Sequence, residues 1–84
     1  MLGFSLVAVT GRQLRAARDL LGWEQMDLKR HAKVSIGTIR RMESFRGPVN
    51  ARTETLSKVV TAMERFGIKF ESDQHYEVVK IRIP

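Results

Sequence analysis

The side chains that could support catalysis or hold a metal are few in this sequence. The chain has two histidines, His31 and His75, and no cysteine. Neither histidine has a second one at the spacing of a metal site, and no nucleophile is paired with a base. The acids Glu24, Asp27 and Glu43 fit helix capping and ion pairs better than acid–base catalysis. We therefore expect no enzyme and no metal or cofactor, with His31 on a helix surface and His75 in a turn.

The basic side chains offer a different chemistry, the recognition of a polyanion. Fifteen lysines and arginines stand against nine acids, which gives a formal net charge of +6. The excess lies in residues 1–42, which carry eight basic residues and three acids. Such an imbalance favours a nucleic-acid partner, although many small proteins are basic for solubility alone.

The chain has 84 residues, a length that fits one domain, and its helices and strands must position these side chains. Residues 1–9 read as an N-terminal arm or short strand, 10–66 as a helical core and 67–84 as a β-hairpin tail. The apolar start is far shorter than the roughly 20 residues that span a bilayer, and it lacks the basic flank of a signal peptide. With no cysteine to form a disulfide, we expect a cytoplasmic protein without a membrane segment.

The first helix is predicted to begin at Thr10 and to end at Gly22. Thr10 and Gln13 have the spacing of a capping box, and Gly22 tolerates the left-handed backbone of a helix end. The apolar face repeats at helical spacing, while the arginines at 12, 15 and 18 take the polar side; this face comprises Leu14, Ala17 and Leu21.

Two short helices follow, joined by a tight turn. The second is predicted from about Glu24 to Ala32, and Ser35 can cap a third over about 35–44. In that third helix Ile39 and Met42 would face the core, whereas Arg40 and Arg41 would not. Three more residues are expected to face the core: Leu28 and Ala32 in the second helix, and Val34 in the turn.

The remainder is a loop, a fourth helix and the tail. Residues 45–52 contain Gly and Pro and read as a loop. A helix opens at Thr53 and stops at Gly67, with an apolar stripe of Leu56, Val59, Val60, Met63 and Phe66. Alternating residues over 68–71 and about 76–83 predict an antiparallel hairpin. The fold class is therefore mainly α with a C-terminal hairpin.

Residues 12–43 resemble the Cro/repressor, or xenobiotic-response-element, family of helix-turn-helix proteins. The matching runs are Leu-Gly-Trp-x-Gln at 21–25 and Val-Ser-x-x-Thr-Ile-x-Arg-x-Glu at 34–43. The resemblance implies a four- to five-helix Cro/repressor-like domain whose helix over 35–44 enters the major groove of duplex DNA. It also implies a transcriptional regulator, in a family whose members commonly bind as dimers, so a homodimer is one expected state.

The same resemblance assigns candidate DNA-binding residues. Gln25 would contact a phosphate, and Ile36, Gly37, Arg40 and Arg41 would occupy the positions that face the bases. Arginine is the best single reader of guanine. Lys33 and Arg46 flank the helix and could neutralise phosphates. The full set is Gln25, Lys33, Ser35, Ile36, Gly37, Thr38, Arg40, Arg41 and Arg46.

Two departures from the family leave a second function open. Lys33 stands where many members have glycine, so it is expected to adopt a left-handed backbone. Ile36 and Gly37 stand where polar base readers are common, and an exposed isoleucine suits a protein contact. The alternative is a protein-binding module, an antiactivator or antitoxin, that holds a transcription activator or another partner through Ile36 and Arg40.

Overall fold

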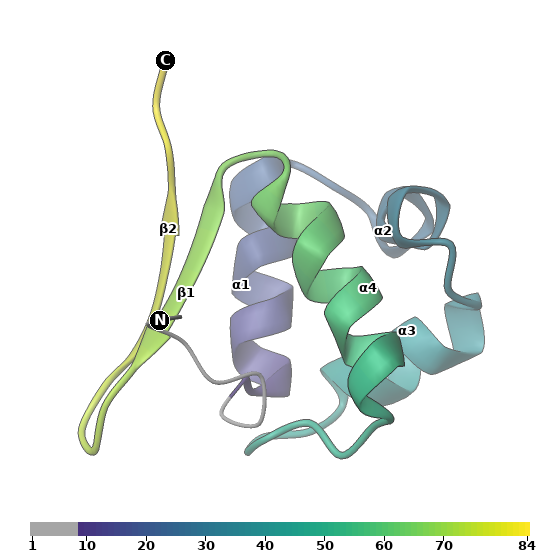
Figure 1. Ribbon diagram of the computed structural model, residues 1–84, viewed down its shortest axis with the longest axis horizontal. Helices are drawn as coiled ribbons and strands as arrows, with labels where there is room; N and C mark the ends of the chain where they lie inside the picture. Colours follow the sequence, from purple (N-terminus) through teal and green to yellow (C-terminus); the bar gives the residue numbers. More distant parts are fainter. Residues whose placement is uncertain (1–8) are drawn as a thin grey trace.

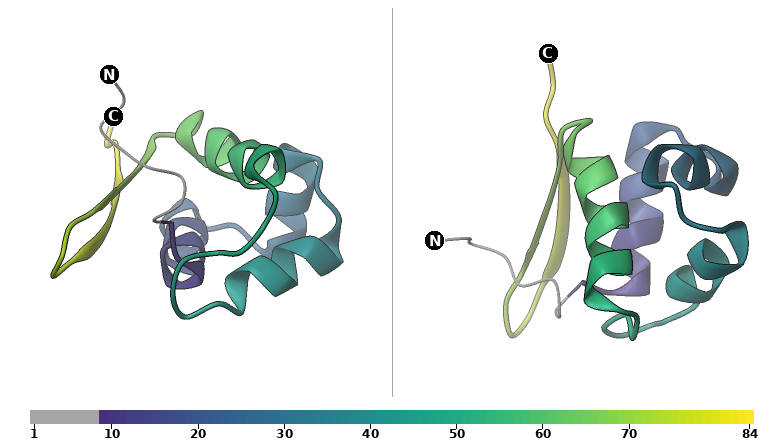
Figure 2. Two further views of the ribbon diagram at one scale, coloured as in Figure 1. Left: turned by 60° about the horizontal axis from the view of Figure 1, so that its bottom comes forward. Right: turned by 45° about the vertical axis from the view of Figure 1, so that its right-hand side comes forward.

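The computed structural model describes residues 9–84 as four helices followed by a two-stranded antiparallel sheet. The elements are α1 (Gly11–Leu21), α2 (Gln25–Ala32), α3 (Ile36–Glu43), α4 (Thr53–Glu64), β1 (Ile68–Ser72) and β2 (Glu77–Ile81). Figures 1 and 2 show three layers, with α1 and α4 between the hairpin on one side and α2 and α3 on the other. The α+β class is confirmed. The strand expected within residues 1–9 falls almost wholly outside the described residues, which contain four helices and no fifth.

The predicted helix boundaries hold closely. Thr10 caps α1 in a full capping box with Gln13, and Gly22 ends the helix with φ 70°. Lys33 ends α2 with φ 58°, the left-handed backbone expected of it. The fourth helix ends at Glu64, earlier than predicted, because the amides of Phe66 and Gly67 each bond to the carbonyl three residues back. This tighter turn carries the chain into β1.

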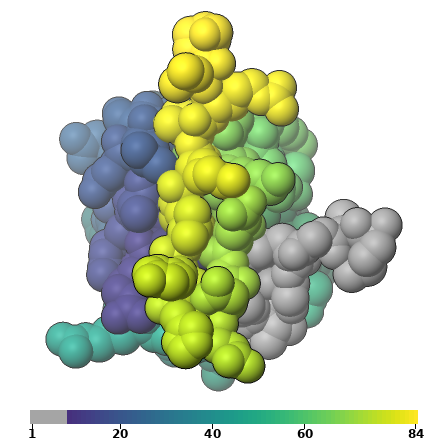
Figure 3. Space-filling view, turned by 90° about the vertical axis from the view of Figure 1, so that its left-hand side faces the viewer, coloured from purple at the N-terminus to yellow at the C-terminus, as the bar shows by residue number. Residues whose placement is uncertain are grey.

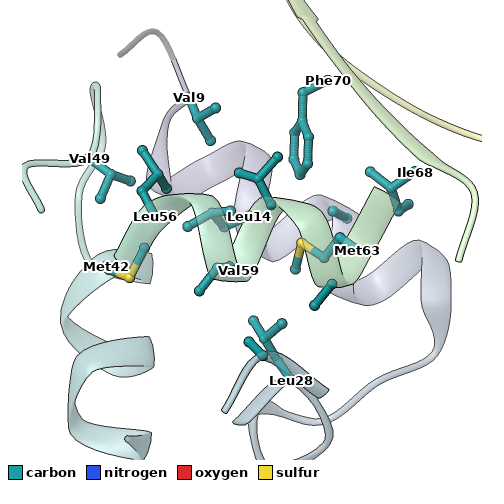
Figure 4. Packing of buried hydrophobic residues seen from close by; sticks show 14 of the residues in the cluster. Val9, Leu14, Leu28, Met42, Val49, Leu56, Val59, Met63, Ile68 and Phe70 are labelled. Carbon is teal, nitrogen blue, oxygen red and sulfur yellow. The ribbon is translucent and has the colours of Figure 1, made fainter. Parts of the chain in front are cut away.

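The core is formed by one face of each helix and the inner face of the hairpin (Figure 4). The burial predicted for Leu56, Val60 and Met63 of α4 is confirmed, and Leu14 and Leu28 are buried in the same cluster. Phe66, the last residue of the predicted stripe, lies beyond the end of α4 and is exposed, so its place in the core was predicted wrongly. Burying each such side chain contributes roughly 1.5–3 kcal/mol relative to exposure. Helices as short as α2 and α3 are marginal alone, so this shared core is what keeps them folded.

The predicted hairpin is confirmed, with Ile68 paired to Ile81 and Phe70 paired to Val79. Phe70 is among the largest fully buried side chains, so the hairpin contributes to the core.

The hairpin is also tied to α1 by polar groups. The buried Gln13 amide donates to the carbonyls of Glu71 (2.9 Å) and Val78 (3.2 Å), one on each strand. Glu77 accepts from Thr10 and forms an ion pair with Arg12 at 2.6 Å. The start of α1 and the hairpin are therefore held in one fixed arrangement.

Gly11 brings the start of α1 against the end of α3. A Cβ placed there would lie 2.1 Å from the Phe45 carbonyl oxygen and 2.8 Å from that of Met42. The Gly11 amide donates to Gly47, and Thr10 bridges to Pro48. This close approach fixes the loop that follows α3.

Candidate nucleic-acid interface

A buried ion pair joins α1 to α3 behind the predicted DNA-binding surface. Arg18 donates from Nε and Nη2 to the two carboxylate oxygens of Glu43, at 2.9 and 3.0 Å. The side chains of Arg18 and Glu43 are only 15% and 3% exposed. The hydrogen bond to Glu43 raises the pKa of Arg18 above its ordinary value. A third bond from Arg18, to the Trp23 carbonyl at 3.0 Å, fixes the segment that leads into α2.

The sequence predicted only part of this ion pair. An ion pair was predicted for Glu43, but Arg18 was placed with the other arginines on the polar side of the first helix. Its guanidinium instead turns toward α3 and is largely covered. Two arginines, Arg15 and Arg18, contact Glu43, one at the backbone carbonyl and one at the carboxylate. Their separation from Glu43 along the chain hides the contact from any local pattern.

Gln25, the predicted phosphate ligand, is drawn into the same network. Its amide nitrogen donates to Glu43 Oε1 at 3.1 Å, and its side chain lies at the start of α2. One amide hydrogen remains for another acceptor. The network therefore links α1, α2 and α3 through a single carboxylate, which fixes how the two short helices sit relative to each other.

The acids Glu24 and Asp27 have the structural roles predicted for them. Asp27 accepts from the Glu24 amide at 2.7 Å in a capping box at the start of α2. Asp27 also forms an ion pair with Arg30 on the exposed side of the helix. The beginning of α2 is thus stabilised on both sides.

At the start of α3, Ser35 and Thr38 bond to each other. Ser35 Oγ accepts from the Thr38 amide at 3.2 Å and donates to Thr38 Oγ1 at 2.9 Å. Ser35 is the N-cap of the helix, and Thr38 lies in its first turn. Their contacts place them at its N-terminus, where the partial positive charge of the helix end lies.

Arg40 and Arg41 point outward from α3, while Ile39, Met42 and Glu43 are buried on its other side. Arg41 also donates from Nη1 to the Asn50 carbonyl at 3.0 Å. That contact holds the loop after α3 and leaves the other guanidinium hydrogens of Arg41 available.

Ile36 is half-buried and packs against the core. The expectation of an exposed isoleucine on this surface was therefore wrong. Ile36 opens α3 directly after the turn, where its side chain turns back onto the apolar cluster. Lys33 precedes α3 in the chain and Arg46 follows it, and both side chains are exposed.

A cluster of three rings was missed by the sequence reasoning. The rings of Trp23 and His31 stack with centroids 4.4 Å apart, and Phe66 meets both edge-on, at 5.1 and 4.8 Å. Trp23 is half-buried and packs against the core. His31 is exposed on α2, as expected. The three positions share no helical period, so no local pattern connects them.

Comparison with known proteins adds no assignment, since neither the protein-family models nor the curated proteins include a match to this chain. Among residues 9–84, no group of three acidic, histidine or cysteine side chains is placed to hold a metal ion. In the same part of the chain, every helix is too short or too polar to cross a membrane.

Proposed function

We propose that this protein is a helix-turn-helix regulator that binds duplex DNA with α3 in the major groove. The observation that carries the proposal is the two-sided character of α3. Its inner side is fully buried and held by the Glu43 network, and its outer side presents Arg40 and Arg41. A rigid, exposed helix fits the width of the major groove, and its guanidinium groups match the acceptors of guanine.

Gly37 supports the same proposal. A Cβ built at this position meets nothing within 4 Å, so no contact inside the protein requires glycine there. Glycine within a helix is less stable than alanine by about 0.5–1 kcal/mol. A bare backbone at this exposed turn allows a partner to approach α3 closely, and the edge of a base pair is such a partner.

The surrounding residues take positioning roles in this proposal. Lys33 and Arg46 would contact phosphates, which add affinity without sequence preference. Gln25 would offer its remaining amide hydrogen to a phosphate while Glu43 holds the other. Arg41 would read a base while keeping the following loop in place through Asn50.

The alternative is an antiactivator or antitoxin that binds a protein. It rests on Ile36 and Gly37, which are weak base readers, and the half-buried Ile36 offers a partner less apolar surface than an exposed side chain would. It is retained here as one outcome of the test that follows.

The test is selection of a binding sequence from a random duplex pool, followed by fluorescence anisotropy at several salt concentrations. We expect Arg41→Ala and Arg40→Ala to cost about 1–3 kcal/mol each and to relax preference at one base pair. The control is Arg82→Ala, which removes the same charge from the far side of the molecule and should change affinity little. Binding that does not depend on salt, or an Arg82→Ala effect as large as that of Arg41→Ala, would overturn the proposal. A protein captured by the same surface would then favour the alternative.

A further inference from the structure

A second surface lies on the other side of the molecule, at the open end of the hairpin. There a groove of about 870 Å³ is lined by residues 64–69 and 80–84, and we call it the hairpin-end groove. It is larger than the groove of about 570 Å³ between α1 and β2. Figure 1 shows β2 and the residues after it running on past the turn between α4 and β1.

The groove has an incompletely covered apolar lining. Phe66 is 47% exposed and Ile83 is 80% exposed, and Ile81 between them is half-buried. Isolated exposed apolar residues are ordinary, but here they meet at one concave site. The lining could therefore receive one or two large apolar side chains of a partner.

The charge around this lining is strongly biased. Four cations, Arg65, Lys69, Lys80 and Arg82, line the groove together with a single acid, Glu64. Among the described residues, neither Arg65 nor Arg82 has a carboxylate within ion-pair distance.

The two lysines are an unusual pair. Lys69 lies directly opposite Lys80 across the hairpin, and like charges in such a position are destabilising. Both reach the carboxylate of Glu71, Lys69 at 3.7 Å and Lys80 at 3.0 Å. The hydrogen bond from Lys80, with the charges of both lysines, lowers the pKa of Glu71. One carboxylate shared by two ammonium groups leaves positive charge for a further anion (Figure 3 shows this outer side of the hairpin).

We infer that the hairpin-end groove binds an acidic peptide segment that carries large apolar side chains. The carboxylates would meet the cationic rim, and the apolar side chains would cover Phe66, Ile81 and Ile83. A second copy of this chain fits poorly because its net charge is +6. The apolar lining distinguishes the site from one for a nucleic-acid backbone. The groove is lined by the hairpin and by the end of α4, and Figure 2 shows the hairpin and α3 on opposite sides of α1 and α4. The inference therefore does not depend on the proposed DNA binding.

The probe is a short labelled peptide in which leucine and phenylalanine stand among aspartates and glutamates, measured by fluorescence anisotropy against the whole chain. Polyglutamate and a duplex without the selected DNA sequence serve as comparison ligands. We expect saturable binding of the peptide, with polyglutamate weaker by about tenfold. Equal binding of polyglutamate would show that the apolar lining is not used, and tighter binding of the duplex at the groove would assign it to nucleic acid; either result overturns the inference.

Variants locate the site. Arg82→Glu and Ile83→Ser should each weaken peptide binding about fivefold, since each removes one contact at an exposed rim. Lys58→Glu, an equal charge change on the exposed side of α4, is the matched control and should change binding less than twofold. Ile83 is so exposed that its replacement leaves the core intact. Equal effects of Arg82→Glu and Lys58→Glu, or no effect of Ile83→Ser, would refute the inference.

Discussion

Removing the Glu43 carboxylate tests how α2 and α3 are held together. In Glu43→Ala the guanidinium of Arg18 loses two hydrogen bonds, and the amide of Gln25 loses one. Breaking a buried pair by removing one partner costs roughly 3–5 kcal/mol. Arg18 keeps 15% exposure, so water relieves part of the penalty and we expect about 3 kcal/mol. That is a large share of the roughly 5–15 kcal/mol of a typical domain.

The assay is urea unfolding followed by circular dichroism. For a slope near 1.5 kcal/mol per molar, a loss of 3 kcal/mol lowers the midpoint by about 2 M. Arg30→Ala is the control, because it breaks the exposed pair with Asp27 and should cost no more than about 1 kcal/mol. The double variant Arg18→Met with Glu43→Leu should recover most of the loss, since an apolar pair leaves no charge buried alone. If Glu43→Ala cost no more than Arg30→Ala, the network would not be what fixes α3.

Three further predictions concern the core, the contact of Gly11 with the end of α3, and the ion pair that joins α1 to the hairpin. Met63→Ala should cost about 2–5 kcal/mol in urea unfolding, since Met63 is fully buried, and a loss below half a kilocalorie would show that its site is open. Gly11→Ala should cost more than about 2 kcal/mol because its Cβ would collide with the Phe45 carbonyl, and a neutral effect would contradict that close approach. The hydrogen bond from Arg12 lowers the pKa of Glu77, so this contact stabilises the fold above the ordinary glutamate pKa and is lost as pH falls through the lowered one. The free energy of unfolding should therefore fall less steeply in Glu77→Gln as pH is lowered from neutral to strongly acidic. The same pH dependence in both proteins would show that the Arg12–Glu77 contact does not stabilise the fold.

Local chemistry made most of the secondary structure predictable. The Thr10–Gln13 capping box and the alternation around Phe70 each depend on residues close together in the chain, and both are confirmed. The left-handed backbone of Lys33 is also confirmed, but it was expected from the family resemblance. The end of α4 was predicted too late. Phe66 continues the apolar spacing of the helix, although the backbone has already left the α-helix after Glu64.

Contacts between distant residues were not predictable in the same way. The partner of Glu43 is Arg18, 25 positions away, and any of several arginines was an equally good candidate from sequence. The burial of Ile36 depends on how the turn before α3 directs its side chain. Among the candidate DNA-binding residues, sequence indicated that Arg40 and Arg41 face outward, but it did not indicate that Gln25 and Arg41 also make contacts within the protein.

The anchoring of the hairpin by Gln13 has a consequence for how the chain acquires its fold. Gln13 bonds to Val78, 65 positions later, and Thr10 bonds to Glu77, 67 positions later. Contacts of such long range are slow to form, because the intervening chain must be ordered first. On the ribosome, Thr10 and Gln13 therefore cannot complete these bonds until residues 77 and 78 have been synthesised. A fragment ending before β2 would leave Gln13 with one of its two acceptors, the Glu71 carbonyl, and Thr10 without Glu77. The four helices therefore cannot be separated from β2 without loss of stability.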